Sequence, residues 1–208
     1  VGTLAGVVKD ASVVNVSVDA TNVICQGRNI VGGVVGLVCG KSNLANITSN
    51  VSVNSNFSSS KDFEKLGYSL FYSYYDEQNN YFNNSESVSY AGNVCGVVDT
   101  ESNSNNNQSL RNIKVLGGAR SIGTITGFVA GLVCENSGID NAKVYVNSSN
   151  YLNSNYSAGL VCGENRGYVS RVETKYDGLN QLSKTFIKNN CKFVGGIVGF
   201  NNNGTVVN

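Results

Sequence analysis

Short runs of valine, isoleucine and leucine alternate with serine and asparagine along the whole chain, and one glycine-containing run returns six times. The copies are VGTLAGVV, VGGVVGLVC, AGNVCGVVD, TGFVAGLVC, NYSAGLVC and VGGIVGFN. Five copies carry two glycines four residues apart, and in the NYSAGLVC copy Asn155 stands where the first glycine is expected, ahead of Gly159. A short phrase repeated this often predicts a repeat protein.

The spacing of the copies gives the size of the repeat. The first positions of the phrase fall at residues 2, 32, 92, 127, 155 and 195, with gaps of 30, 60, 35, 28 and 40. The gap of 60 is twice 30, so it contains a degenerate repeat, an insertion or both. A unit of roughly 30 residues fits one coil of a β-solenoid.

Each phrase and the segment after it have the composition of strands. The phrase is rich in valine and glycine, and a second run follows in which apolar and polar residues alternate. The apolar residues of these second runs are Val14, Val16, Val18; Ile47, Val51, Val53; Ile113, Val115; Val144, Val146; Val169, Val172; Val206 and Val207. Because this much glycine disfavours helices, we predict an all-β fold. It is a right-handed parallel β-solenoid of about six coils of roughly 30 residues, a single domain over residues 1–208.

The glycine phrase is apolar on both sides of the expected strand, which is typical of a strand covered on both faces. The cover is an inserted segment, a neighbouring chain or another molecule. Alternatively, the glycines only permit tight packing inside a narrow coil.

Two inserts interrupt the repeats, at about residues 58–90 and 176–190. Both contain apolar residues at helical spacing, so we expect a short helix in each. The first insert also holds a dense group of aromatic residues, which either covers exposed core or binds a glycan or protein partner. The candidate ligand contacts are Tyr68, Tyr72, Tyr74, Tyr75 and Tyr81.

The glycine phrase resembles the GLUG-motif repeats of large cell-surface proteins. Their pattern is two glycines, two apolar residues, a glycine, a variable residue, an asparagine and then a glycine turn. Residues 195–204, from Gly195 and Gly196 to Asn201 and Gly204, match it best, and GLVCGENRG at 159–167 matches in part. The resemblance implies a β-solenoid stalk in a secreted or surface-anchored protein, usually without catalytic activity. The cysteines and the irregular spacing depart from the motif.

Composition argues against several classes of function. The chain has no His, Trp, Met or Pro, which removes the commonest general base and metal ligand, so no catalytic residue, metal ligand or cofactor is assigned and we expect a non-enzyme. Charge is balanced, with 15 Lys and Arg against 14 Asp and Glu. The chain lacks the cluster of basic residues that would predict nucleic-acid binding. No stretch approaches the length of an apolar membrane span, so no membrane insertion is expected.

The six cysteines form no C-x-x-C pair, and we expect disulfides in an extracellular chain. Cys39, Cys134 and Cys162 share one place in the phrase, and equivalent Cα atoms on neighbouring rungs lie about 4.8 Å apart, within disulfide range. The sequence thus predicts a Cys134–Cys162 bridge and a similar pairing of Cys39 with Cys95. Cys25 and Cys191 are left for neighbouring chains. The alternative is that all six are small buried apolar residues.

Asparagine is abundant, and many asparagines stand in the N-glycosylation sequence Asn-x-Ser/Thr. The candidates are Asn15, Asn46, Asn50, Asn56, Asn83, Asn107, Asn147, Asn155 and Asn203. We expect glycans on several of them, outside the cell or on its surface. The alternative is that asparagine fills turns and ladders in which stacked amides bond between rungs.

These features favour a non-enzymatic, glycosylated structural protein of the cell surface. Residues 1 and 208 fall within repeat segments, so we expect end coils without caps. The partner is then the chain itself, in a head-to-tail filament or surface coat, or flanking repeats of a longer array. The alternative is an adhesin, a glycan- or protein-binding module that uses the aromatic insert 63–82. A polysaccharide-cleaving enzyme is the third hypothesis, and it lacks clustered acids.

Overall fold

The computed structural model describes residues 1–55, 89–101, 108–116, 120–147, 150–176, 187–188 and 191–207. The described residues form strands and turns and no helix. Every strand pairing among them is parallel. The chain therefore winds as a parallel β-solenoid, which confirms the fold expected from the repeats.

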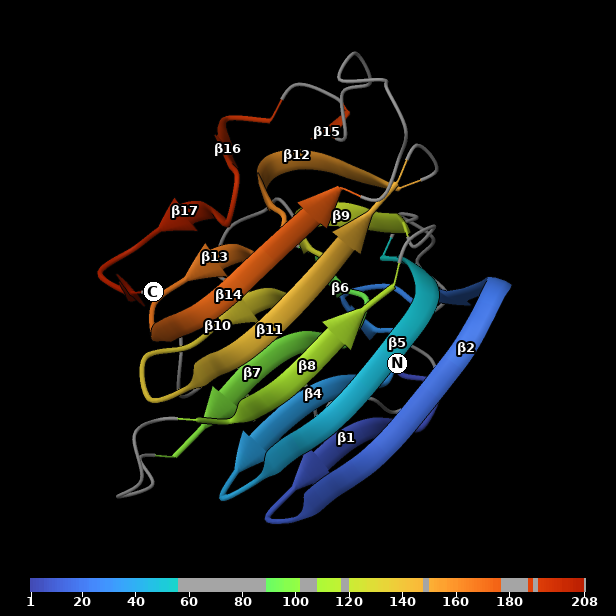
Figure 1. Ribbon diagram of the computed structural model, residues 1–208, viewed down its shortest axis with the longest axis vertical. Coiled ribbons are helices and arrows are strands. Elements are labelled where there is room, and N and C mark those ends of the chain that lie inside the picture. Colours follow the sequence, from blue (N-terminus) through green and yellow to red (C-terminus); the bar gives the residue numbers. More distant parts are fainter. Residues whose placement is uncertain are drawn as a thin grey trace, which may run out of the picture.

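The glycine phrase supplies the first sheet, in which one strand from each coil stacks on the next (Figure 1). Its strands are β1 (Ala5–Lys9), β4 (Val35–Gly40), β7 (Cys95–Thr100), β10 (Ala130–Val133), β13 (Cys162–Asn165) and β17 (Val198–Asn201).

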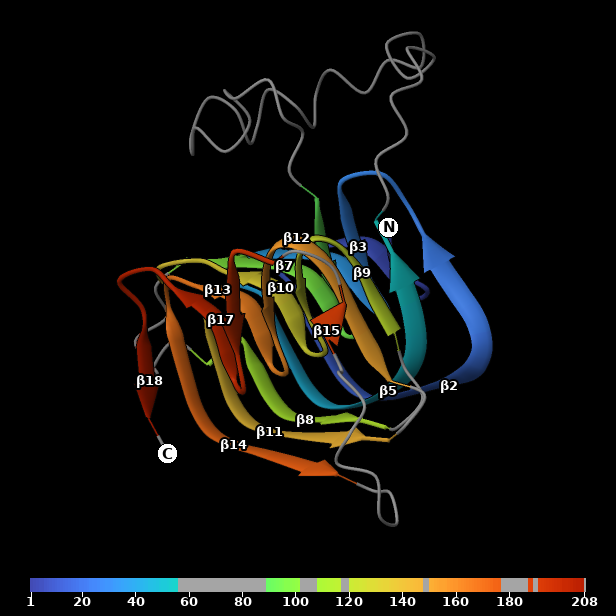
Figure 2. The same cartoon turned by 90° about the horizontal axis from the view of Figure 1, so that it is seen from above.

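The alternating runs that follow each phrase form a second stack. Its strands are β2 (Ser12–Gln26), β5 (Asn43–Asn54), β8 (Leu110–Val115), β11 (Gly138–Val146), β14 (Tyr168–Tyr176) and β18 (Thr205–Val207). Figure 2 shows this stack as a curved wall that faces the first sheet. β2 and β18 lie at opposite ends of it.

Return segments make a third stack that leads each coil back to the next glycine phrase. Its strands are β3 (Ile30–Gly32), β6 (Tyr90–Gly92), β9 (Arg120–Gly127), β12 (Tyr151–Gly159), β15 (Ile187–Lys188) and β16 (Phe193–Gly195). The second and third stacks join where β5 pairs with β9, so together they form a 12-stranded sheet.

The coil count is slightly lower than expected. The structure winds about four turns rather than six, with strands at both ends that belong to incomplete coils. The gap of 60 residues is a single coil with an insertion, because β4 pairs directly with β7 and β5 with β8. Residues 56–88 of that insertion lie outside the described residues, and so do residues 177–186 of the second insert. The helices and tyrosine contacts predicted there stay predictions.

The register of one repeat differs from the sequence prediction. Gly159 pairs with Gly127, the first glycine of its phrase, and not with the second. Cys162 accordingly lies opposite Ala130, so Gly163 is the second glycine of that coil. Asn155 lies earlier in β12 and does not replace a glycine.

The first glycine of each phrase forms a corner where a side chain has no room. A Cβ on Gly127 would lie 2.6 Å from the Cα of Cys162 in the next coil and closer still to the carbonyl oxygen of Ala130. The second glycine presses on the return strand instead, and a Cβ on Gly131 would lie 2.8 Å from the backbone nitrogen of Ala91. Both sets of glycines thus allow close packing within the chain itself, as in the simpler of the two sequence hypotheses.

Aliphatic side chains stack in rows through the interior. One row runs Val13, Leu44, Leu110, Ile139, Val169 and Val206 along the second stack. The first sheet is covered on both faces, by this core on one side and by Tyr90 and Ile125 of the return strands on the other. Because the chain covers both faces itself, the apolar character of the phrase requires no further molecule.

Candidate functional site: the two end coils and the asparagine row

Exposed apolar side chains gather at the two ends of the solenoid. Among the described residues, every exposed large apolar side chain lies in the first coil or in the last ones. They are Val1, Leu4, Val7, Val14, Val23 and Ile24 at one end, and Tyr176, Phe193, Val194, Val206 and Val207 at the other. Exposed apolar side chains that gather in one region are typical of interaction sites.

Residues at the same place in other coils are buried. Leu4 is 52% exposed, whereas its counterpart Val34 is fully buried, at 0%. At the opposite end Val206 is 40% exposed, while Val169, its partner on the next rung, is 0% exposed. The exposure of Leu4 and Val206 therefore comes from the missing neighbour. Val14 and Val207 differ, because their row also contains the exposed Arg111.

The backbone of the end strands is paired on one side only within the described part of the chain. β1 and β2 pair only with β4 and β5, and β17 and β18 pair only with β13 and β14. Free edges of parallel strands present a row of N–H and C=O groups that can pair with another strand. Each end thus combines open hydrogen-bonding groups with apolar side chains.

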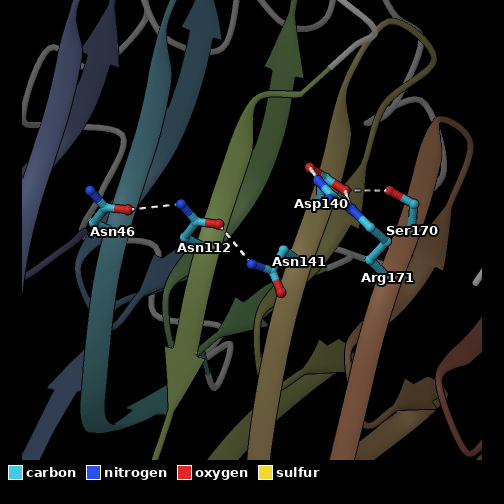
Figure 3. A network of polar contacts seen from close by, with 6 residues as sticks. All are labelled: Asn46, Asn112, Asp140, Asn141, Ser170 and Arg171. Carbon is cyan, nitrogen blue, oxygen red and sulfur yellow. Dashed lines mark hydrogen bonds and ion pairs between the residues drawn. The ribbon is translucent and has the colours of Figure 1, made fainter.

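A row of stacked asparagines runs along the outer surface of the second stack (Figure 3). The Nδ2 of Asn46 donates to the Oδ1 of Asn15 at 2.8 Å. The Nδ2 of Asn112 donates to Asn46 Oδ1 at 2.9 Å, and that of Asn141 donates to Asn112 Oδ1 at 2.7 Å. All donors point toward the N-terminal end of the stack.

The backbone explains why asparagine occupies this row. All four asparagines have a positive φ, between 53° and 60°. Asparagine tolerates this left-handed conformation better than other residues with a side chain, because its short amide bonds locally. In this conformation each asparagine shifts the alternation by one residue, so that apolar residues three apart, such as Leu44 and Ile47, both lie in the core.

Arg171 takes the fifth position and ends the asparagine row. It keeps the left-handed conformation, with φ 49°. Its side chain reaches back to Asp140, with Nε 2.8 Å from Oδ1 and Nη2 in contact with Oδ2. Ser170 donates a further bond to Asp140 at 2.7 Å (Figure 3). The bonds from Arg171 lower the pKa of the Asp140 carboxyl, against the effect of burial.

Aromatic side chains gather at the C-terminal end. The rings of Phe193 and Phe200 stack with centroids 4.6 Å apart, and Tyr156 packs edge-on to Phe193 at 5.4 Å. The Lys192 ammonium lies 5.6 Å from the Tyr156 ring centroid. Phe193 stands at the place in the coil that Tyr90 and Ile125 fill elsewhere, so it continues the row of return-strand side chains that includes Tyr90 and Ile125.

The predicted disulfides are absent from the structure, in which no disulfide joins any two of the six cysteines. Cys162 stacks on Ala130, and Cys134 lies four residues after Ala130, just past the end of β10. The equivalence that predicted a Cys134–Cys162 bridge is therefore wrong. Cys95 stacks on Val35, whereas Cys39 stacks on Asp99, so the Cys39–Cys95 pairing is wrong as well. Cys25 is buried and Cys191 is half-buried.

The buried thiols behave as small apolar residues, as in the alternative prediction. Burial raises the pKa of Cys95 to about 12 and also raises that of Cys162. Thiols with a raised pKa are poor nucleophiles at neutral pH.

The sequons differ in accessibility. Asn15, Asn46, Asn155 and Asn203 are exposed and Asn147 is half-buried, whereas Asn50 is buried with its Nδ2 3.2 Å from Asp19 Oδ1. A glycan on Asn50 does not fit this structure. Asn56, Asn83 and Asn107 lie outside the described residues.

The described residues contain no group of three or more acidic or Cys side chains placed to hold a metal ion. Nor do they contain a helix long and apolar enough to span a membrane. No family model matches the chain, and the searches of curated proteins and of solved structures found no match. The resemblance to GLUG-motif repeats therefore stays a prediction.

The sequence held a signal for the asparagine row. Four of the six second runs contain an apolar residue, any residue, an asparagine and an apolar residue: Val13–Val16, Leu44–Ile47, Leu110–Ile113 and Ile139–Ala142. Asparagine at a fixed point of an alternating strand indicates a repeated left-handed residue. The alternative that asparagines stack between rungs predicted such a row in general, but it named no residues.

Proposed function

We propose that this protein is a non-enzymatic structural protein of the cell exterior. Its solenoid extends by stacking coil on coil, as a filament or surface coat of many copies or as part of a longer array. The observation that carries the proposal is the exposure of end-coil residues whose counterparts in interior coils are fully buried. Covering these apolar side chains would stabilise the stacked coils by roughly 25 cal/mol per Å² of apolar surface removed from water.

The support for the cell exterior is the set of exposed sequons, because the structure contains no disulfide that would indicate the same location. Glycosylation of such sequons takes place in the secretory pathway and would put glycans on a surface that water already reaches. The outward rows of the second stack carry polar and charged side chains, as Lys143 and Glu173 show. A rod of this kind remains hydrated along its sides while its ends associate.

Sedimentation velocity with negative-stain electron microscopy tests the proposal. The unaltered chain should form rods longer than one copy as its concentration rises. Val7→Lys and Val206→Lys place a charge on one end face each, and each should abolish elongation while circular dichroism shows that the fold is retained. Thr48→Lys adds the same charge to the outer side of an interior coil and should leave elongation unchanged. Monomers at every concentration would refute the filament and the coat of many copies, and only the longer array would remain.

A second candidate function, an adhesin, rests on the density of tyrosine in the insert 63–82. Aromatic rings stack on sugar faces and anchor protein partners. A glycan array with the chain and with a Tyr72→Ala, Tyr74→Ala, Tyr75→Ala variant separates the two functions. Binding that the triple variant loses, together with unchanged rod formation, favours the adhesin. No binding at all removes it.

A further inference from the structure

We infer that the outer face of β8, β11 and β14 is a binding site for an acidic polysaccharide. The choice of a polysaccharide rests on the proposed location outside the cell, whereas the face itself does not depend on the association of copies. Nor does it depend on where the described solenoid begins or ends, because a further coil would lie beside this face and not on it.

Basic residues that lie far apart in the sequence meet on this face. Lys143 stacks on Lys114 of the neighbouring coil, and Lys175 lies one rung further on and two residues further along its strand. Arg111 is exposed as well, because the left-handed Asn112 shifts the alternation in β8. The five exposed cations of the face are Arg111, Lys114, Lys143, Arg171 and Lys175.

Positive charge prevails on the face. The three strands contain two carboxylates against these five cations, which leaves a net charge of +3, whereas the whole chain carries +1. Asp140 is buried and bonded to Arg171, and Glu173 is shared between two exposed lysines at 2.9 and 3.7 Å. Among the described residues Arg111 and Lys114 form no ion pair, so their charges are open to an anion from solution.

The spacing of the cations fits an extended polymer better than a small anion. Lys114 and Lys143 are one rung apart, which is about 4.8 Å between their Cα atoms. Arg111 precedes Lys114 by three residues, at most about 10 Å along the strand. A single sulfate ion would contact only part of this set. A chain with a negative charge on each repeating unit can lie across the whole set and form several charge-assisted hydrogen bonds.

The asparagine row adds groups that bind hydroxyls between the cations. Asn112 lies between Arg111 and Lys114 in β8, and Asn141 takes the same place in β11. Each Nδ2 carries two N–H groups, of which the row uses one. The second N–H can donate to a sugar hydroxyl. The face therefore offers neutral donors beside its cations, which suits a polymer of charged sugars.

A nucleic acid fits this face less well. Duplexes are read by a helix or a two-stranded ribbon that enters a groove, whereas β8, β11 and β14 are inner strands of a continuous sheet. Single strands stack their bases on open aromatic rings. Tyr145, which lies among the cations, is half-buried, and the Lys114 ammonium already lies 5.3 Å from its ring centroid. The chemistry of the face therefore favours hydroxyl and acidic groups over bases.

Fluorescence anisotropy with labelled polymers tests the site in the full chain. The probes are heparin as a sulfated polysaccharide, polygalacturonate as a carboxylated one, neutral dextran and single-stranded DNA. A face variant, Lys114→Gln with Lys143→Gln, removes two cations from the site. The matched control is Lys41→Gln with Lys192→Gln, because it removes the same charge from exposed positions before β5 and before β16. Circular dichroism checks that both variants keep the fold.

At about 0.15 M NaCl we expect at least one of the two acidic polysaccharides to bind more tightly than DNA, and dextran not to bind. The face variant should bind about tenfold more weakly, and the control should bind as the unaltered chain does. Glu173→Gln removes the exposed carboxylate from the face and should strengthen binding about threefold, a gain that damage to the fold would not produce.

Three results would overturn the inference. They are a failure of both acidic polysaccharides to bind, tighter binding of DNA than of either polysaccharide, and a face variant that loses no more affinity than the control. Rod formation is measured separately on the same proteins. Rods without polysaccharide binding would leave the proposed assembly intact, and binding without rods would leave the site intact.

Discussion

Replacing Asn112 tests whether the asparagine row stabilises the solenoid. Asn112 lies in the middle of the row and takes part in two side-chain hydrogen bonds, as donor to Asn46 and as acceptor from Asn141. Alanine removes both bonds and must also adopt the φ of 53°. Aspartate keeps the acceptor and tolerates the backbone conformation, but it cannot donate to Asn46.

The magnitudes follow from these contacts. A net hydrogen bond contributes about 0.5–1.5 kcal/mol, and exposure of the row favours the lower half of that range. The left-handed conformation costs alanine about 1 kcal/mol more than asparagine. We therefore expect Asn112→Ala, which loses two bonds and the backbone preference, to lower the free energy of unfolding by about 2–3 kcal/mol. Asn112→Asp, which loses one bond, should lower it by about 0.5–1 kcal/mol.

Urea unfolding followed by circular dichroism measures both variants. Lys114→Ala is the control. Lys114 is exposed, lies two residues after Asn112 in the same strand and has an ordinary φ, so its replacement should lower the free energy of unfolding by less than about 1 kcal/mol. A loss below about 0.5 kcal/mol for Asn112→Ala would refute a stabilising row. A loss for aspartate equal to that for alanine would refute the backbone part of the reasoning.

Three further predictions concern the corners, the buried carboxylate and the thiols. Gly127→Ala should lower the free energy of unfolding, measured in urea, by about 3 kcal/mol or more through overpacking. Gly196→Ala, whose Cβ would meet nothing within 4 Å, should be nearly neutral. Equal effects would contradict the claim that the corner at Gly127 has no room for a side chain. Because the pKa of Asp140 is lowered in the fold, its stabilisation is present above about pH 4 and is lost as pH falls through the folded pKa. Arg171→Met should flatten this acid limb of the stability–pH curve, and an unchanged limb would show that the pair does not act. In the native protein a thiol reagent should modify Cys191 first, while Cys95 reacts only on unfolding; prompt reaction of Cys95 would contradict its burial.

Most of the fold could be predicted from the repeat pattern. Alternation in the second runs predicted the strands that contain Ile47, Ile113 and Val144, and all three side chains lie in the core. Alternation works here because each coil repeats the same inside and outside positions. The insertion behind the gap of 60 residues could not be told from a degenerate repeat, since only strand pairing distinguishes them.

The register of the NYSAGLVC copy could not be settled from the letters alone. The string GLVC occurs at residues 36–39, 131–134 and 159–162. In the first two it begins at the second glycine of the phrase, and at Gly159 it begins at the first. Both glycine positions lack room for a Cβ and both precede apolar residues, so the same letters fit either place. The wrong disulfide predictions follow directly from this ambiguity.

The end faces were predicted only in outline. The sequence indicated strands at both ends, but exposure depends on which residues of neighbouring coils stack on each side chain. Leu4 and Val34 have the same apolar character, and only the position of their coils makes one exposed and the other buried.

The axial repeat of assembled rods tests the central claim most directly. Six strands stack in the first sheet, and at about 4.8 Å per rung each copy would add about 29 Å to a head-to-tail rod. Cryo-electron microscopy or fibre diffraction of the assembled chain should show this repeat together with the 4.8 Å spacing along the same axis. Rods with the 4.8 Å spacing alone, or a protein that stays monomeric at high concentration, would contradict the end-to-end assembly of copies.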